Sequence, residues 1–131
     1  MPNYCFSVSL NVPMDEAIDT LKKTLMDHHL GIVSDVGVSD IVKNKLNEDM
    51  NPYRILGACN PKMAKTMIDE VADIGSLLPC TITAREVAGV TTFDFMDPEI
   101  VLGLAENNVV NQVAQEAKAK LLSVKKALEQ G

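Results

Sequence analysis

The sequence lacks the motifs that identify several large classes of protein. It contains neither G-x-G-x-x-G nor G-x-x-x-x-G-K-[ST], so nucleotide binding has no support from a phosphate-binding loop. Basic residues are scarce, since 12 Lys and Arg stand against 18 Asp and Glu and leave a net charge of −6. Such an acidic chain would repel a phosphate backbone instead of displacing its counterions. We therefore expect no nucleic acid partner.

Long hydrophobic runs and a basic leader are also missing. The chain starts MPNYCFSVSL, and no uninterrupted apolar stretch approaches the roughly 20 residues of a membrane span. The three cysteines include no Cys-x-x-Cys pair, and without a leader they fit reduced thiols better than a disulfide scaffold. We expect a cytoplasmic protein with no membrane partner.

Length and composition are those of one compact unit. The chain has 131 residues, of which 47% are hydrophobic, which is enough for one core and too little for two comfortable domains. The sequence shows no internal repeat, linker or low-complexity segment. Residues 1–131 are therefore expected to form a single domain.

The first half of the chain switches between strand-like and helix-like spacing. Residues 4–10 alternate between apolar and less apolar side chains, as in a strand covered on one face only. Apolar residues between 13 and 30 recur at helical spacing, which predicts an amphipathic helix. A short strand over 31–38 and a polar helix over 40–49 follow, and Asn51-Pro52 breaks that helix.

The second half continues in the same way. Asn60-Pro61 and Asp97-Pro98 each place a helix-capping residue before a proline that suits the first turn. The apolar strands around Ala88-Gly89 predict an antiparallel hairpin. The expected elements are a strand over 53–59, a helix over 61–71, strands over 80–87 and 90–96, a helix beginning at 98, and a longer helix after a break near Asn107-Asn108.

These elements predict an α+β two-layer sandwich. Its sheet would be mixed or mainly antiparallel, with about five strands and with helices on one face. The other face then needs a cover, since a soluble domain tolerates few large exposed apolar patches. A second copy of the chain is the simplest cover, so we expect a homodimer.

A cysteine occupies the junction between an apolar strand and a helix. In the run YRILGACNP, Cys59 ends the strand and Asn60-Pro61 starts the helix. A helix N-terminus favours a thiolate, which makes Cys59 the candidate nucleophile and the thiol expected to react fastest. A small buried thiol without chemistry is the competing interpretation. Cys80, after Leu77-Leu78-Pro79, opens an apolar strand and fits that second interpretation better.

The same segments carry a resemblance to a known family. YRILGACNP, then a helix, then DIGSLLPC from Asp73 to Cys80, then a strand pair ending in Met96-Asp97-Pro98-Glu99 together resemble domain-of-unknown-function family 302. The resemblance implies a small two-layer α/β fold that is usually dimeric. It implies no particular activity and transfers no functional residues.

Two further groups of residues are candidates for binding. Arg54, Arg85, Asp94 and Thr92 lie on expected strands, where they either converge on the open face as a polar or anion-binding pocket or form surface ion pairs.

A sulfur stripe is the second group. Cys59, Met63 and Met67 are four residues apart, which would align a thiolate and two thioethers for a soft metal ion. The same spacing continues to Val71 as an ordinary core stripe, so no metal site is predicted.

The relation between Cys59 and Cys80 depends on the path of the chain between them. A helix over 61–71 carries the chain about 16 Å away, and a regular β-α-β path would start the next strand at the far end of the sheet. The eight residues from Ala72 to Pro79 could nevertheless span about 26 Å and return. We predict that the two thiols stay unpaired, because a reducing compartment disfavours disulfides.

The function predicted from these patterns is a binding module. Its pocket would lie near Cys59 and hold a small ligand or partner, and the sequence points to no cofactor. The alternative is a thiol-dependent enzyme or redox protein that uses Cys59. The candidate ligand-binding residues are Cys59, Asn60, Arg54, Arg85 and Cys80.

Overall fold

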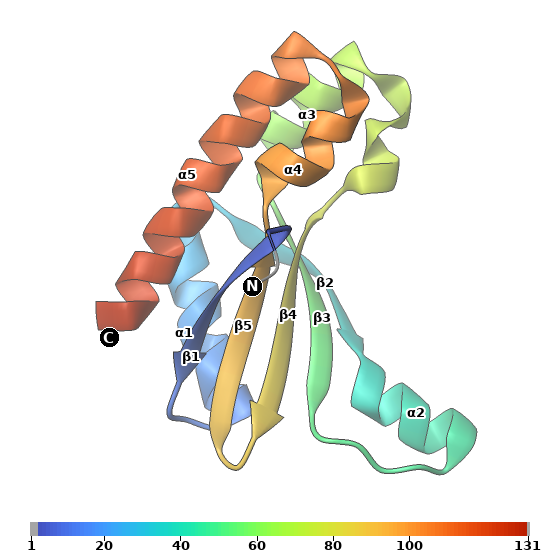
Figure 1. Cartoon of the computed structure of the whole chain (residues 1–131), viewed down its shortest axis with the longest axis vertical. Helices are drawn as coiled ribbons and strands as arrows, with labels where there is room; N and C mark the ends of the chain where they lie inside the picture. The colour runs from blue at the N-terminus through green and yellow to red at the C-terminus, as the bar shows by residue number, and fades with distance from the viewer. Residues whose placement is uncertain (1–2, 131) are drawn as a thin grey trace.

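A computed structural model describes residues 3–130 as two layers, a sheet and a set of helices (Figure 1). The elements are β1 (Cys5–Leu10), α1 (Met14–Asp27), β2 (Gly31–Gly37), α2 (Val38–Leu46), β3 (Tyr53–Cys59), α3 (Pro61–Glu70), η1 (Ala72–Leu77), β4 (Cys80–Val87), β5 (Val90–Met96), α4 (Pro98–Leu102), η2 (Gly103–Ala105) and α5 (Asn108–Gln130). The predicted α+β sandwich is confirmed. The predicted order of helices and strands is also found, with the two short 3₁₀ turns added.

The sheet has five strands in the order β1-β5-β4-β3-β2, and all its pairings are antiparallel. The predicted hairpin joins β4 to β5 through Ala88 and Gly89, both at positive φ, with Val87 opposite Val90. Strands β3 and β4 pair directly although α3 and η1 separate them in sequence. The chain therefore returns to the end of the sheet that it left.

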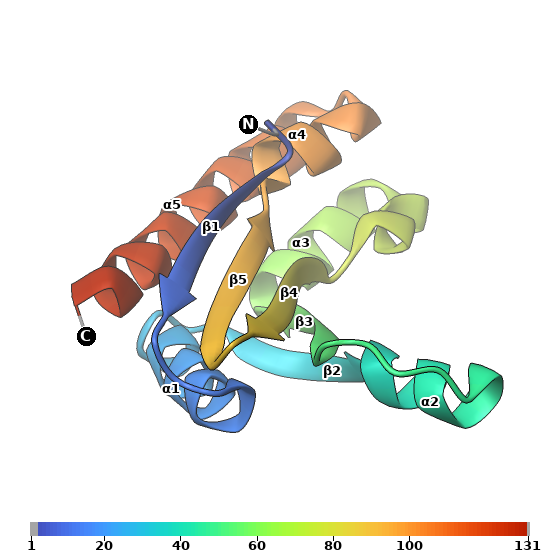
Figure 2. The same cartoon turned by 60° about the horizontal axis from the view of Figure 1, so that its bottom comes forward.

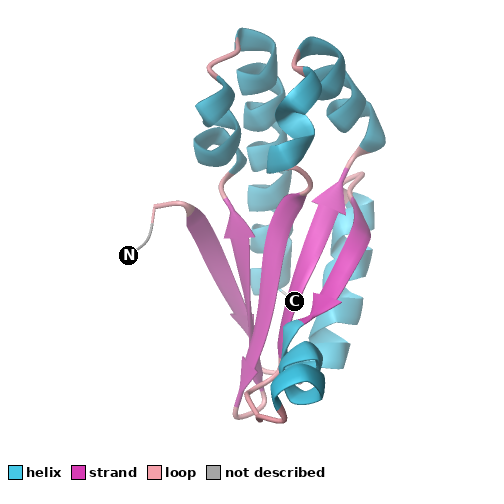
Figure 3. Cartoon of the chain, turned by 90° about the vertical axis from the view of Figure 1, so that its right-hand side faces the viewer, coloured by secondary structure: helices cyan, strands magenta, loops and turns pink. Residues whose placement is uncertain are grey.

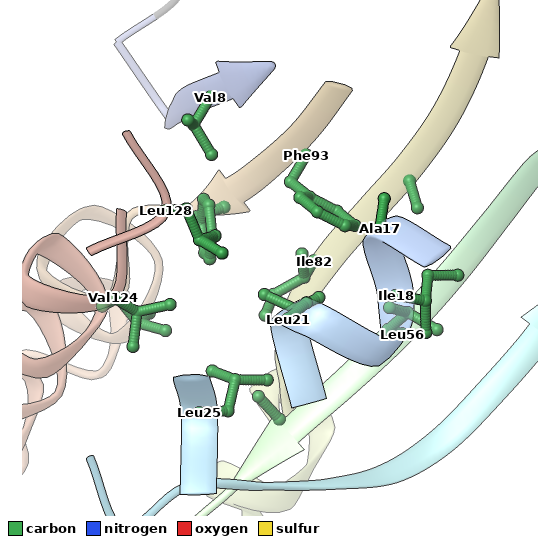
Figure 4. Packing of buried hydrophobic residues seen from close by; sticks show 14 of the residues in the cluster. Val8, Ala17, Ile18, Leu21, Leu25, Leu56, Ile82, Phe93, Val124 and Leu128 are labelled. Carbon is green, nitrogen blue, oxygen red and sulfur yellow. The ribbon is translucent and has the colours of Figure 1, made fainter. Parts of the chain in front are cut away.

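Helices α1 and α5 cover one face of the sheet, and Figure 3 shows both lying behind the strands. Their apolar stripes meet the inward residues of the strands, including the fully buried Phe93 and Ile82 (Figure 4). Phe95 belongs to the same buried cluster. This core explains the alternation seen in β1 and β5, because only one side of each strand faces the helices.

A second, smaller core lies beyond the sheet, where α3, α4, η1 and the first part of α5 pack together (Figure 3). Its buried residues are Met67, Ile74, Leu102, Val110, Val113 and Ala114. The six-residue η1 was not predicted. It places Ile74 in this core, and its turn reverses the chain after α3.

Side-chain caps start three of the helices, α3, α4 and α5, the last through Asn107 Oδ1, which accepts a hydrogen bond from the Val110 amide at 3.0 Å. Asn60 Oδ1 accepts a hydrogen bond from the Met63 amide at 3.1 Å, and Asp97 Oδ1 accepts one from the Glu99 amide at 2.9 Å. Both caps were predicted. Pro13 has no capping side chain, and the first amide of α1 donates instead to Glu86 Oε1 on β4 at 2.7 Å. That bond ties the start of α1 to the sheet.

Helix α2 projects away from the body on the side opposite α5 (Figures 1 and 2). The expectation of a short polar helix is confirmed, and none of its residues is buried. Ile41 and Leu46 are 48% and 62% exposed.

Gly57 is a point of close approach between neighbouring segments of the sheet. A Cβ added there would overlap Ser34 Oγ on β2 and the ring of Pro79, which precedes β4. Glycine therefore permits the two neighbouring segments to meet over β3.

We predict that Gly57→Ala destabilises the fold by about 1–3 kcal/mol, because Ser34 and Pro79 must move apart. Gly75→Ala is the matched control, since a Cβ there meets nothing within 4 Å. Urea unfolding of both variants measures the difference. Equal stability of the two variants would contradict the close packing around Gly57.

Candidate functional site

The uncovered face of the sheet carries a groove of about 680 Å³. Four strands, β1, β5, β4 and β3, supply its walls, and no helix lies over it among the described residues 3–130 (Figure 3). The groove is lined by Tyr4, Cys5, Phe6, Ser7, Tyr53, Thr81, Thr83, Arg85, Asp94 and Met96. Its volume lies in the range of small-molecule sites.

A carboxylate organises the polar part of this groove. Asp94 Oδ1 accepts a hydrogen bond from Ser7 Oγ at 2.6 Å, and Asp94 Oδ2 accepts one from Thr83 Oγ1 at 2.8 Å. Arg85 donates to both oxygens, at 2.9 Å from Nε and 3.3 Å from Nη2. Three strands thus converge on one side chain, because Ser7 and Thr83 stand directly opposite Asp94 in the ladder.

These contacts decide the charge of the groove. Burial alone would raise the pKa of Asp94, but the hydrogen bonds from Arg85, Ser7 and Thr83 outweigh it and hold that pKa below its usual value. Asp94 is therefore ionised at neutral pH, and it neutralises Arg85. The predicted convergence of Arg85 and Asp94 on the open face is found, as an ion pair that leaves the guanidinium less available to an external anion.

Thr92 also lies on this face, where its hydroxyl is 2.8 Å from that of Ser9. Arg54 does not join the group. Arg54 stands opposite Ala84 in the pairing of β3 with β4, so its side chain points to the helix-covered side of the sheet. There it pairs with Asp35 and Asp15. The possibility that Arg54 and Arg85 share one pocket is therefore wrong.

A second cavity lies beside Cys59, as expected, but it is small, about 30 Å³. Strand pairing explains how it forms, because Cys80 stands opposite Ala58, the neighbour of Cys59. The return of the chain to this end of the sheet thus brings the two cysteines together. The cavity is lined by Leu30, Ala58, Cys59, Asn60, Met63, Ala64, Met67, Leu78, Pro79, Cys80, Leu102 and Ala117.

The thiols themselves are protonated at neutral pH. Burial raises the pKa of Cys59, so the lowered pKa expected from the helix N-terminus is wrong in direction. Burial, with a contribution from the neighbouring Cys59, raises the pKa of Cys80 to about 11. All three cysteines are free in the structure. Cys80 is partly buried and packs against the main hydrophobic core.

Residues 3–130 hold no group of three His, Cys, Asp or Glu side chains arranged for a metal ion. Within that same range, no helix combines the length and the apolar character that crossing a membrane requires.

Sequence reasoning missed several groove residues, among them Ser7, Thr83 and the two tyrosines Tyr4 and Tyr53. The alternation in β1 did place Ser7 on the less apolar side of its strand. Combined with the strand order, that signal would have located Ser7 opposite Asp94.

The sheet with one open face, the groove on that face and the small cavity at its end define a small α+β sandwich protein with two candidate binding sites. The chain belongs to the family described as "Domain of unknown function DUF302", which matches residues 6–128. The resemblance seen in YRILGACNP and DIGSLLPC is thus confirmed.

A solved structure shows the same fold. It is described as the crystal structure of an uncharacterized conserved protein DUF302 from Bacillus stearothermophilus. Sequence identity is 22%, the alignment covers 95% of this chain and 98% of that one, and the TM-score is 0.86. No curated protein matched the sequence.

Thiol labelling against pH tests the state of the two cysteines. We predict slow alkylation of Cys59 and Cys80 by iodoacetamide at pH 7, with Cys80 the slower, because only about one Cys80 thiol in 10,000 is ionised at that pH when its pKa is about 11. Peptide mapping of labelled protein at pH 7 to 10 gives each rate. Rapid labelling of Cys59 below neutral pH would instead support the nucleophile hypothesis.

Asp94→Asn should destabilise the protein by roughly 1–2 kcal/mol at pH 7, because it replaces a charged acceptor of four hydrogen bonds. The folded-state pKa of Asp94 is lowered, so its contribution is present above about pH 4 and is lost as the pH falls further. The difference from wild type should therefore shrink in acid.

Asp69→Asn is the control for this prediction, since Asp69 makes an exposed pair with Lys65 one helical turn away. It should change stability by less than about 0.5 kcal/mol. Chemical unfolding at several pH values measures both variants. A pH-independent effect of Asp94→Asn would show that the charge of Asp94 contributes little.

Proposed function

We propose that this protein is a homodimeric, cytoplasmic binding module whose ligand occupies the groove on the open face of the sheet. The observation that carries the proposal is the one-sided arrangement of the helices, which leaves a groove of about 680 Å³ on the other face. A second copy of the chain would close that groove from above.

Apolar side chains around the groove support a protein cover. Val36 and Ile55 face each other across β2 and β3 and are 43% and 36% exposed. Tyr4 and Val87 are more exposed still, at 61% and 57%. Together with the apolar side of α2, they form an unpartnered surface around a polar centre. A self-complementary surface of this kind suits a two-fold dimer.

The groove favours a small ligand with both polar and apolar parts. Arg85 and Asp94 neutralise each other, so a strongly charged ligand would have to break their pair. The hydroxyls of Ser7, Thr83 and the two tyrosines offer hydrogen bonds, while Met96 offers apolar contact. The predicted pocket near Cys59 is less suitable for an organic ligand, because about 30 Å³ holds no more than a few atoms.

The alternative of a thiol-dependent enzyme using Cys59 has weaker support. Its nucleophile would need a thiolate near neutral pH, whereas burial raises the pKa of Cys59. The labelling experiment above separates the two functions.

The dimer is tested by light scattering at micromolar concentration. Wild type should give twice the mass of the 14.2 kDa chain. Ile55→Lys places a charge in the proposed interface and should weaken dimerisation roughly 30-fold. Met26→Lys is the control, since Met26 is 71% exposed on α1 in the helical layer. A monomeric wild type, or equal weakening of dimerisation in both variants, would contradict the proposed interface.

A further inference from the structure

Four sulfur-bearing side chains from three elements line the small cavity at the end of the sheet. Cys59 ends β3, Cys80 begins β4, and Met63 and Met67 lie one turn apart on α3. The sequence alone indicated that three of them lie together, from the four-residue spacing of Cys59, Met63 and Met67. The pairing of β3 with β4 adds the second thiol, which the spacing alone did not place.

The rest of the lining selects for a soft ion. Among the described residues 3–130, the cavity walls contain no histidine and no carboxylate, and Asn60 is their single polar residue besides the cysteines. Hard ions such as Mg²⁺ and Ca²⁺ require oxygen ligands, and zinc sites take four nitrogen, sulfur or oxygen ligands. Thiolate and thioether ligands together are typical of Cu(I). A volume of about 30 Å³ also suits one ion better than an organic molecule.

We propose that this cavity binds a single Cu(I) ion through the thiolates of Cys59 and Cys80 and a thioether of Met63 or Met67. This proposal is independent of the ligand groove on the open face. Binding forms two copper–thiolate bonds and releases both thiol protons to solvent, and copper stays in the +1 state throughout.

The surroundings offer access and a compensating charge. Cys59 and Met63 are partly exposed, whereas Met67 is 3% exposed and belongs to the second core. A complex of Cu(I) with two thiolates carries one negative charge. The adjoining surface depression shares Asn60 and Met63 with the cavity and is also lined by His29, Lys62 and Lys120. Lys62 and Lys120 place positive charge next to the anionic complex, with Glu116 opposing them in part.

Anaerobic titration with Cu(I) against a chromophoric Cu(I) chelator tests the site in the full chain. Wild type should take up one equivalent. Cys59→Ser and Cys80→Ser should each weaken binding at least about tenfold, and the double substitution Met63→Leu with Met67→Leu should weaken it measurably while preserving the apolar packing. Cys5→Ser is the matched control and should bind as wild type does, because Cys5 lies in the other groove.

X-ray absorption of the wild-type Cu(I) complex gives a second measurement that requires no variant. We expect a first coordination shell of sulfur alone. A shell with nitrogen or oxygen donors, undiminished binding by the Cys59→Ser and Cys80→Ser variants, or equal weakening by Cys5→Ser would each overturn the proposal. Circular dichroism of each variant shows whether a loss of copper binding comes with a loss of fold. If a variant is unfolded, the X-ray absorption of the wild-type complex decides whether sulfur alone binds the ion.

Discussion

The antiparallel pairing of β3 with β4 is the interaction on which both candidate sites depend. It sets Ala58 opposite Cys80 and Tyr53 opposite Arg85, so one register builds the sulfur-lined cavity at one end and part of the groove along the open face. The pairing requires Ser34 and Pro79 to approach over Gly57, where a side chain would obstruct them. A slip of one residue would move Arg85 to the helix-covered side and take Cys80 out of the cavity.

The fold was predictable because its periodic signals are local. Alternation located β1, the Ala88-Gly89 turn located the hairpin of β4 and β5, helical spacing located α1 and α5, and the cap-proline pairs marked the starts of α3 and α4. The candidate site was predictable only in part. The run YRILGAC is apolar on both sides of the strand, so it does not show which face Arg54 occupies. Pairing with β4 decides that, and pairing between distant segments leaves no local pattern.

The error over Cys59 has a similar origin. Proximity to a helix start is visible in sequence, and it favours a thiolate. The degree of burial is a tertiary property, however, and here Met63, Pro79 and Cys80 enclose the same cavity as Cys59. Desolvation by these neighbours raises the pKa of the thiol. A cysteine at a strand-to-helix junction is therefore reactive only where the surrounding elements leave it in contact with water or a partner charge.

The two sites differ in chemistry because they lie on different parts of the two-layer fold. The groove borders water, so its strands present hydroxyls, tyrosines and a neutralised ion pair, and a ligand or second chain would replace that water. The small cavity is enclosed by α3, α4 and α5, and there a charge is tolerated only when donors satisfy it directly. Sulfur side chains meet both demands, since they pack as apolar groups without an ion and coordinate a soft ion when it is present. The same residues can thus stabilise the fold and form a binding site.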